Sequence, residues 1–163
     1  MEIKRLKSEK LNVLENFVNE LSNELNVDFF NQVSTFERGV QRGKKYKVEK
    51  FKSTLYKSLS IGYEVSFIPH SNESVELWVI NVKERGKGLG SEILSKVLDV
   101  SDRTGIKVKL VPVDYDRNDN TPKNYLDSLK NWYTEGFGFQ RPKFSFDPYY
   151  TYYPSVEEYK MVS

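Results

Sequence analysis

The sequence predicts a mixed α/β fold, in which helices flank a central mixed sheet that is mostly antiparallel. Some segments place apolar residues at every third or fourth position, as on one face of a helix. Others alternate apolar with polar residues or run apolar over a short stretch, as strands do. The two kinds of segment follow one another without a repeat or a linker, so we expect one domain over residues 1–163.

The N-terminal part predicts one helix, followed by a segment without a clear period. The helix runs from residue 8 to about residue 26, and its apolar face is formed by Leu11, Leu14, Val18, Leu21 and Leu25. Residues 29 to 45 are mixed and end in the basic cluster RGVQRGKKYK. We interpret this cluster as a solvated turn, with contact to phosphate or to an acidic partner as the alternative.

The middle of the chain predicts a hairpin, a helix and a strand. Alternation from Ile61 to Phe67 predicts a half-buried strand, PHSNES a turn, and ELWVINV the antiparallel partner strand. After a glycine-rich segment, a helix is predicted from about Ser91 to Arg103, and Gly105 suits its C-terminal cap. IKVKLVPV is predicted to be the next strand.

The C-terminal part predicts a further helix and two strands. Thr121 and Pro122 suit the start of a helix that runs to about Thr134. FQRPKF and EEYKMV are predicted strands, and the tyrosine-rich loop DPYYTYYP separates them. We expect this loop to pack over the core; an acceptor pocket is the alternative interpretation for Tyr149, Tyr150, Tyr152 and Tyr153.

Composition excludes several classes of chemistry. The chain has no cysteine, which excludes disulfides, thiolate nucleophiles and cysteine zinc sites. Its one histidine, His70, argues against a metal site, and we interpret it as a turn residue rather than a catalytic base. No segment has the apolar core of a signal peptide or the ~18 apolar residues of a membrane span. We therefore expect a cytoplasmic protein without membrane contact, and a net charge of only +2 argues against nucleic acid.

The segment VKERGKGLGS, from Val82 to Ser91, lies between a predicted strand and a predicted helix. The first N–H groups of a helix have no intrahelical partner and attract anions, and glycine allows a phosphate to approach the backbone. The glycine spacing matches neither the dinucleotide-binding fingerprint nor the Walker P-loop. Phosphate binding and a structural turn both remain open on these grounds.

Two motifs resemble the GNAT superfamily of N-acetyltransferases. RGKGLG, from Arg85 to Gly90, resembles the family's R-G-x-G-x-G signature, which binds the pyrophosphate of acetyl-CoA. The resemblance covers roughly residues 60 to 162, includes the closing EEYKM, and is nearest to small enzymes encoded in bacteriophage genomes, which would place the protein in the host cytoplasm. It implies a GNAT-like sheet with these cofactor-binding residues: Ile80, Asn81, Val82, Arg85, Gly86, Lys87, Gly88, Leu89, Gly90 and Ser91.

The second motif, LKNWYTEGFGF, is similar to the family's L-x-x-[FW]-Y-x-x-x-G-F segment, whose tyrosine is commonly a general acid. Taking Gly138 and Phe139 as the G-F pair leaves one residue too many and makes Tyr133 the acid. The other register leaves one too few and puts Trp132 there; we prefer Tyr133. The chain also lacks the usual proline before the glycine turn, and Asn124 only weakly replaces the family's asparagine.

The resemblance implies direct attack of an amine on the thioester, with Tyr133 protonating the thiolate. Glu76 would be the base and Glu64 the alternative, although each is also interpretable as a solvated strand-end charge. The acceptor would be a small molecule, an amino acid or a protein amine, and an edge-strand homodimer is compatible with the fold.

Two other functions remain open. The first alternative to an N-acetyltransferase is a catalytically inactive GNAT-fold protein that acts as a binding module. The second alternative is a nucleic-acid-binding module that uses Lys44, Lys45 and Lys47 together with the tyrosine loop. The near-neutral net charge argues against this function.

Overall fold

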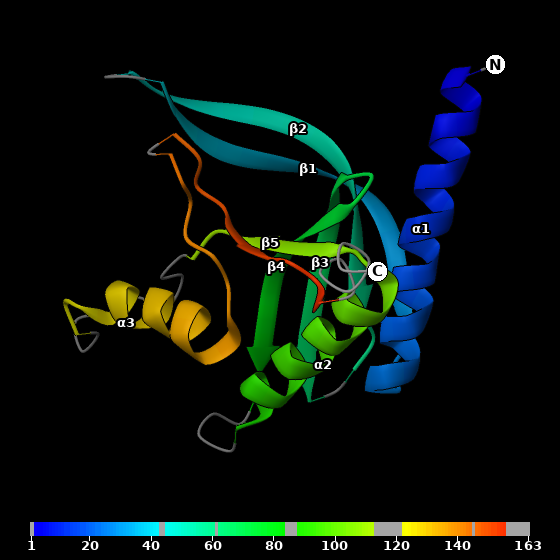
Figure 1. The fold of residues 1–163 in the computed structure, drawn as a ribbon. Coiled ribbons are helices and arrows are strands. Elements are labelled where there is room, and N and C mark those ends of the chain that lie inside the picture. The colour runs from blue at the N-terminus through cyan, green and yellow to red at the C-terminus, as the bar shows by residue number, and fades with distance from the viewer. Residues whose placement is uncertain are drawn as a thin grey trace.

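The computed structural model describes residues 2–42, 45–60, 62–83, 88–112, 122–144 and 146–155 (Figure 1). Its sheet has six strands in the order β1-β2-β3-β4-β5-β6, and each neighbouring pair is antiparallel except β4 and β5. The predicted mixed α/β class with a mostly antiparallel sheet is confirmed. The elements are α1 (Glu2–Leu25), β1 (Phe29–Arg42), β2 (Lys45–Ser58), β3 (Tyr63–Ser71), β4 (Ser74–Val82), α2 (Leu89–Thr104), β5 (Lys107–Leu110), α3 (Tyr125–Asn131), η1 (Trp132–Gly136) and β6 (Tyr150–Tyr152).

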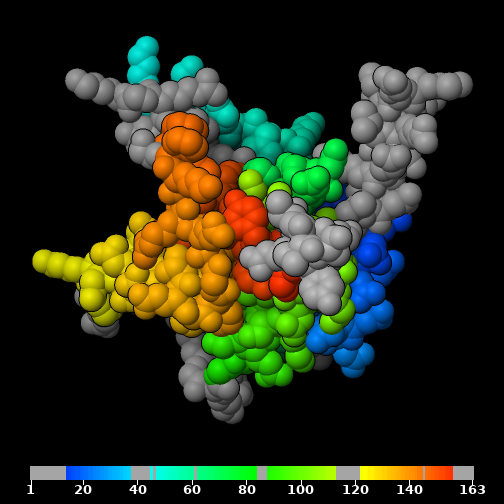
Figure 2. All heavy atoms as spheres, viewed as in Figure 1, coloured from blue at the N-terminus to red at the C-terminus, as the bar shows by residue number. Residues whose placement is uncertain are grey.

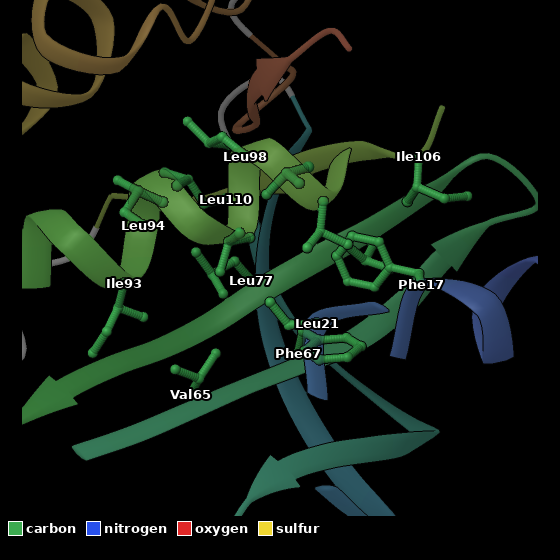
Figure 3. Close-up of a cluster of buried hydrophobic side chains, with 14 of the residues drawn as sticks. Phe17, Leu21, Val65, Phe67, Leu77, Ile93, Leu94, Leu98, Ile106 and Leu110 are labelled. Atoms are coloured by element: carbon green, nitrogen blue, oxygen red, sulfur yellow. The ribbon is translucent and has the colours of Figure 1, made fainter. Parts of the chain in front are cut away.

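Helices α1 and α2 pack side by side on one face of the sheet (Figure 1). Phe17 and Leu21 of α1 are fully buried and meet Phe67 of β3 and Leu94 of α2 in the same core (Figure 3). Leu14, Leu21 and Leu25 of the predicted α1 face are buried and Val18 is partly buried, whereas Phe17 was not predicted as part of this face. At the end of α2, Gly105 has φ 75°, which confirms its role as the C-terminal cap.

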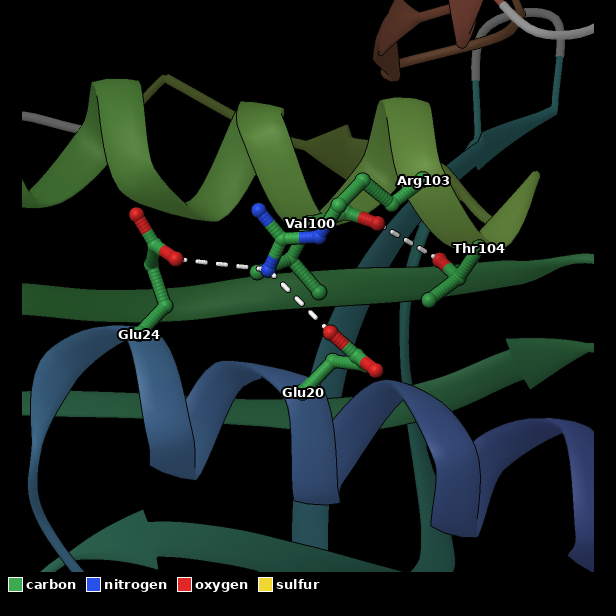
Figure 4. A network of polar contacts seen from close by, with 5 residues as sticks. All are labelled: Glu20, Glu24, Val100, Arg103 and Thr104. Atoms are coloured by element: carbon green, nitrogen blue, oxygen red, sulfur yellow. Dashed lines mark hydrogen bonds and ion pairs between the residues drawn. The ribbon is translucent and has the colours of Figure 1, made fainter.

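One arginine links the two helices at their solvent-exposed border. Arg103 of α2 donates hydrogen bonds to Glu20 at 3.2 Å and to Glu24 at 3.3 Å, both on α1 (Figure 4). The three side chains are substantially exposed, so we expect this network to orient the helices more than to stabilise them.

Residues 29 to 45, which show no clear period in the sequence, belong to a regular hairpin in which β1 and β2 pair from Phe29 and Ser58 to Arg42 and Lys45. The basic cluster RGVQRGKKYK is therefore mostly strand rather than turn, and the two residues between the strands lie outside the described residues. Among the described residues, β2 pairs with β3 only at Tyr56 and Lys57. Much of the hairpin contacts solvent on both faces, so its sequence has no sustained alternation of apolar and polar residues.

Aromatic rings join the hairpin to strand β4. Phe36 and Phe51 stack with their ring centroids 5.5 Å apart, and the ring centroids of Phe36 and of Trp78 in β4 are 4.9 Å apart. The prediction of a half-buried β3 was also wrong, because its central residues Val65 to Ile68 are buried on both faces. PHSNES is mostly strand, and only Asn72 and Glu73 form the turn.

Three predictions near the C-terminus need correction. Helix α3 ends at Asn131 and continues as the π-helical turn η1 rather than as α-helix to Thr134. FQRPKF is not a strand; Gln140 forms one isolated bridge with Thr151. Strand β6 instead lies in the predicted tyrosine loop, because it pairs with β5. Thr121 and the predicted strand EEYKMV lie outside the described residues.

Candidate functional site

Strands β4 and β5 diverge, and their separation opens the edge of β4. Only Ser74, Val75 and Glu76 of β4 pair with β5, opposite Lys107 to Lys109. Beyond Glu76, β4 continues to Val82 and pairs only with β3 in the part of the chain that the structure describes. No described strand therefore pairs with the β5 side of this stretch of β4, on which the predicted residues Ile80, Asn81 and Val82 lie.

A β-bulge lies at the start of the open stretch. Ser66 pairs with Val79 and Phe67 with Leu77, so Trp78 has no opposite residue in β3. The extra residue explains why Leu77, Ile80 and Val82 all contact the helix-side core, since strict alternation would place Ile80 and Val82 on the other face. A bulge bends its strand and increases the local twist, which fits the departure of β4 from β5.

The indole N–H of Trp78 is buried at this bulge. Its Nε1 has no hydrogen-bond partner among the described residues. A buried donor of this kind is uncommon and is often found at functional sites. Nothing in the sequence pattern marks Trp78, because a bulge depends on the pairing of two strands rather than on one strand.

The open edge of β4 leads into the N-terminus of α2 (Figure 1). Gly88 is the N-cap with φ 74°, and no side chain among the described residues caps the helix. The first intrahelical hydrogen bond runs from the Glu92 N–H to the Gly88 carbonyl at 3.0 Å, so the N–H groups of Leu89, Gly90 and Ser91 precede it.

The space beside this helix start is open. A Cβ atom built at Gly88 or at Gly90 meets no heavy atom within 4 Å in the described part of the chain. An anion can therefore approach the backbone closely at the end of the helix that favours negative charge. Arg85, Gly86 and Lys87, the other predicted residues of this turn, lie outside the described residues.

The two candidate carboxylates have different surroundings. Glu76 is only 4% exposed and is the last β4 residue paired with β5, so it lies where the strands part. Glu64 of β3 lies opposite Asn81 and forms an ion pair with Lys57, with 3.3 Å between Oε1 and Nζ. Glu76 is thus not the solvated strand-end charge of the alternative interpretation, and Glu64 is partly buried and paired.

Tyr133 and Trp132 both lie in η1, but they differ in burial. Trp132 is 37% exposed, whereas Tyr133 is partly buried against the core with its ring 5.6 Å from Phe139. Gly138 has φ 79° and Phe139 is 3% exposed. Gly138 and Phe139 therefore form a turn followed by a buried aromatic ring, and the preference for Tyr133 over Trp132 stays a prediction.

His70 and the tyrosines of the C-terminal segment mostly form contacts with neighbouring elements of the fold. His70 lies in β3 rather than in a turn, with Nδ1 3.1 Å from the Ser74 hydroxyl and its ring edge-on to Tyr149. Tyr152 donates a hydrogen bond of 2.9 Å to Asp102, and Tyr150 accepts one of 3.2 Å from Arg141. As expected, parts of the tyrosine-rich segment pack on the core.

Tyr150 also lines a shallow cavity of about 390 Å³ that sequence reasoning did not identify. It lies between the end of β5, helix α3 and the segment from Pro142 to Pro148. Figure 2 shows part of this segment, in orange, beside α3, in yellow. In the described parts of the chain, no group of three or more Asp, Glu or His side chains could hold a metal ion. None of the helices described combines the length and apolar composition of a membrane span.

Comparisons with known proteins give no family assignment, because no family model and no curated protein match the chain. One similar solved structure is the anti-CRISPR protein AcrVA5, with 18% identity, a TM-score of 0.45, and coverage of 60% of this chain and 97% of that one. Another comes from Bacillus anthracis strain Ames, a protein assigned as a streptothricin acetyltransferase and solved in complex with acetyl coenzyme A. It is 16% identical with a TM-score of 0.38, covering 81% of this chain and 92% of that one. Both TM-scores lie below 0.5, so a function for this chain has to rest on its own residues.

Proposed function

We propose that the chain is an acetyl-CoA-dependent N-acetyltransferase that transfers an acetyl group directly to an amine acceptor. The observation that supports this most is the succession of two binding surfaces along the chain. One is the edge of β4 from Leu77 to Val82 that faces away from β3, with which no described strand pairs, and the other is the N-terminus of α2, where no described side chain forms a cap. A ligand with an amide-containing arm and a pyrophosphate at its end matches these two surfaces in order.

The residues present fit such a cosubstrate. The main-chain groups of Ile80, Asn81 and Val82 would pair with the pantetheine amides as an added strand does. The N–H groups of Leu89, Gly90 and Ser91 would hold the pyrophosphate, with Arg85 and Lys87 adding positive charge. When bound, acetyl-CoA supplies the activated acetyl group.

The reacting centre would lie where β4 leaves β5. Main-chain N–H groups at the Trp78 bulge are suitable donors for the developing oxyanion, because no strand of the described chain pairs with this edge. Glu76 would accept a proton from the acceptor ammonium, and Tyr133 would donate one to the departing sulfur. Positioning of the amine beside the thioester would contribute the rest of the rate enhancement, since direct transfer needs no nucleophilic side chain.

The first experiment is calorimetric titration of acetyl-CoA into the wild type and into Gly90→Glu. Gly90 has open space beside it and no positive φ, whereas any side chain at Gly88 would strain the backbone. We expect micromolar-range binding by the wild type and at least a ~30-fold weaker affinity in Gly90→Glu, a loss of roughly 2 kcal/mol in binding free energy.

Two matched variants control this experiment. Ser95→Glu adds the same charge on the exposed side of α2 and should bind acetyl-CoA as the wild type does. Gly90→Ala adds only a methyl group and tests whether bulk alone interferes. Wild-type protein that gives no heat and no competition with labelled coenzyme A would refute the proposal.

Turnover separates the enzyme from an inactive protein of the same fold. A panel of amines, amino acids and lysine peptides would be incubated with acetyl-CoA, and both free coenzyme A and acetylated product would be measured. Tight binding without product across a broad panel would favour the alternative, a GNAT-fold protein that binds a partner without catalysis.

A further inference from the structure

Positive charge is concentrated in the β1–β2 hairpin. Residues 29–58 contain eight Lys or Arg and two Asp or Glu, whereas the whole chain has 25 and 23. The rest of the chain is therefore more acidic than basic, and the near-neutral total hides the separation. A basic element on an acidic body is typical of proteins that contact a polyanion.

The basic side chains that the structure describes on the hairpin are available to a ligand. Lys45, Lys47, Lys50 and Lys52 of β2 are exposed. Lys50 lies 3.8 Å from Glu37, but both side chains are more than 60% exposed and such a pair is weak. Lys57, at the base of the hairpin, forms a closer ion pair with Glu64.

The shape of the hairpin also matters. Each strand has 14 residues, which corresponds to a contour of about 45 Å at the usual rise of a strand. Only Tyr56 and Lys57 join it to the next strand among the residues described, and Phe36 rests on Trp78. The result is a two-stranded ribbon with one anchored end and long open edges (Figure 1).

We propose that this hairpin is a duplex-DNA-binding arm. A two-stranded β-ribbon fits the major groove of B-form DNA, whereas the major groove of A-form RNA is too narrow. Exposed lysines on the ribbon contact phosphates on both walls of such a groove. This inference does not depend on the proposed acetyl transfer.

Two other polyanionic partners fit the surface less well. Protein interfaces centre on exposed aromatic anchors, but the described aromatic side chains of the hairpin, such as Phe36, Phe51 and Tyr56, are all partly buried. Interfacial membrane binding needs a continuous apolar face, and the large apolar side chains exposed on the described hairpin are the isolated Val33 and Val48.

The test is fluorescence anisotropy with a labelled DNA duplex of about two helical turns, between about 50 mM and 200 mM salt. The wild type is compared with Lys45→Glu/Lys47→Glu and with Lys123→Glu/Lys143→Glu. The second pair is also exposed and makes the same change in net charge outside the hairpin. Circular dichroism and acetyl-CoA titration verify that each variant is folded.

We expect the hairpin variant to bind DNA at least ~10-fold more weakly at the lower salt concentration, with the slope of log K against log salt reduced by about 2. The control pair should change neither quantity appreciably. Equal losses in both variants, or no binding by the wild type at low salt, would overturn the proposal. So would tighter binding to duplex RNA, single-stranded DNA or poly-glutamate than to duplex DNA. Unchanged acetyl-CoA binding in the hairpin variant keeps this result separate from the proposed function.

Discussion

Tyr133 lies in a π-helical turn, whose closing hydrogen bonds span more residues than those at an ordinary helix end. The Gly138 N–H bonds to the Thr134 carbonyl at 3.2 Å, and the Phe139 N–H bonds to the Tyr133 carbonyl at 3.1 Å. Each bond spans one residue more than in a Schellman cap. The wider turn lies between the tyrosine and the buried Phe139, and π-bulges are found at many functional sites.

The proposed role of the Tyr133 hydroxyl as proton donor can be tested by removing it. If it protonates the leaving sulfur, Tyr133→Phe lowers kcat about 10- to 100-fold and changes the Kd of acetyl-CoA less than about 2-fold. Steady-state release of coenzyme A with an accepted amine measures the first quantity, and calorimetry the second. Tyr125→Phe is the matched control, because Tyr125 lies on α3 and is 41% exposed. Full activity in Tyr133→Phe would assign the proton to water instead.

At the scale of elements, the base of the hairpin packs on the main core through Phe29 and Tyr56, whereas its more distant part is held by a small aromatic contact. Phe36 bridges Phe51 and Trp78, while the buried cluster is built from α1, α2 and β3 to β5, together with Phe139 and Tyr150 (Figure 3). Elements with few buried contacts open locally at lower free energy than the core. The hairpin and the core are therefore expected to differ in stability.

Removing Phe36 tests this separation. In Phe36→Ala we expect faster hydrogen exchange across β1 and β2, roughly 10-fold or more, with little change in α2 and β4. Mass spectrometry of peptic fragments measures both regions in one experiment. Val33→Ala serves as the control, since Val33 is on the same hairpin and 74% exposed. Equal acceleration throughout the protein would mean that the hairpin and the core unfold together.

At the scale of the molecule, two tyrosines couple stability to alkaline pH. Burial raises the pKa of Tyr56, and the nearby Glu15 carboxylate raises it further. Burial also raises the pKa of Tyr63, although a hydrogen bond with Ser60 and the Lys96 ammonium oppose the shift. Both shifts favour the neutral phenol in the folded protein.

The sign of the effect follows from these directions. Above the ordinary tyrosine pKa of about 10, the unfolded chain loses phenolic protons that the folded chain retains. The free energy of unfolding therefore falls as pH rises from about 10 through the raised pKa values. Urea unfolding at several pH values measures the slope, and Tyr56→Phe should flatten it. An equal slope in the wild type and in Tyr56→Phe would contradict the assignment.

The features that could be predicted from the sequence alone are those set by residues close together in the chain. The apolar faces of α1 and α2, the glycine cap at Gly105 and the glycine turn before α2 depend on residues close together in the chain. The fold class and the order of the candidate motifs follow from these elements. The roles assigned to Glu76 and Tyr133 stay predictions.

The tertiary structure decided the features that depend on pairing between distant segments. The β1–β2 hairpin lacks a sustained pattern because both faces are largely exposed, and β3 hides its pattern because both faces are buried. The bulge at Trp78, the divergence of β4 from β5 and the short strand β6 exist only in relation to a neighbouring strand. Strand preference depends on such neighbours far more than helix preference does, because backbone hydrogen bonds in a sheet are made between strands and not within one.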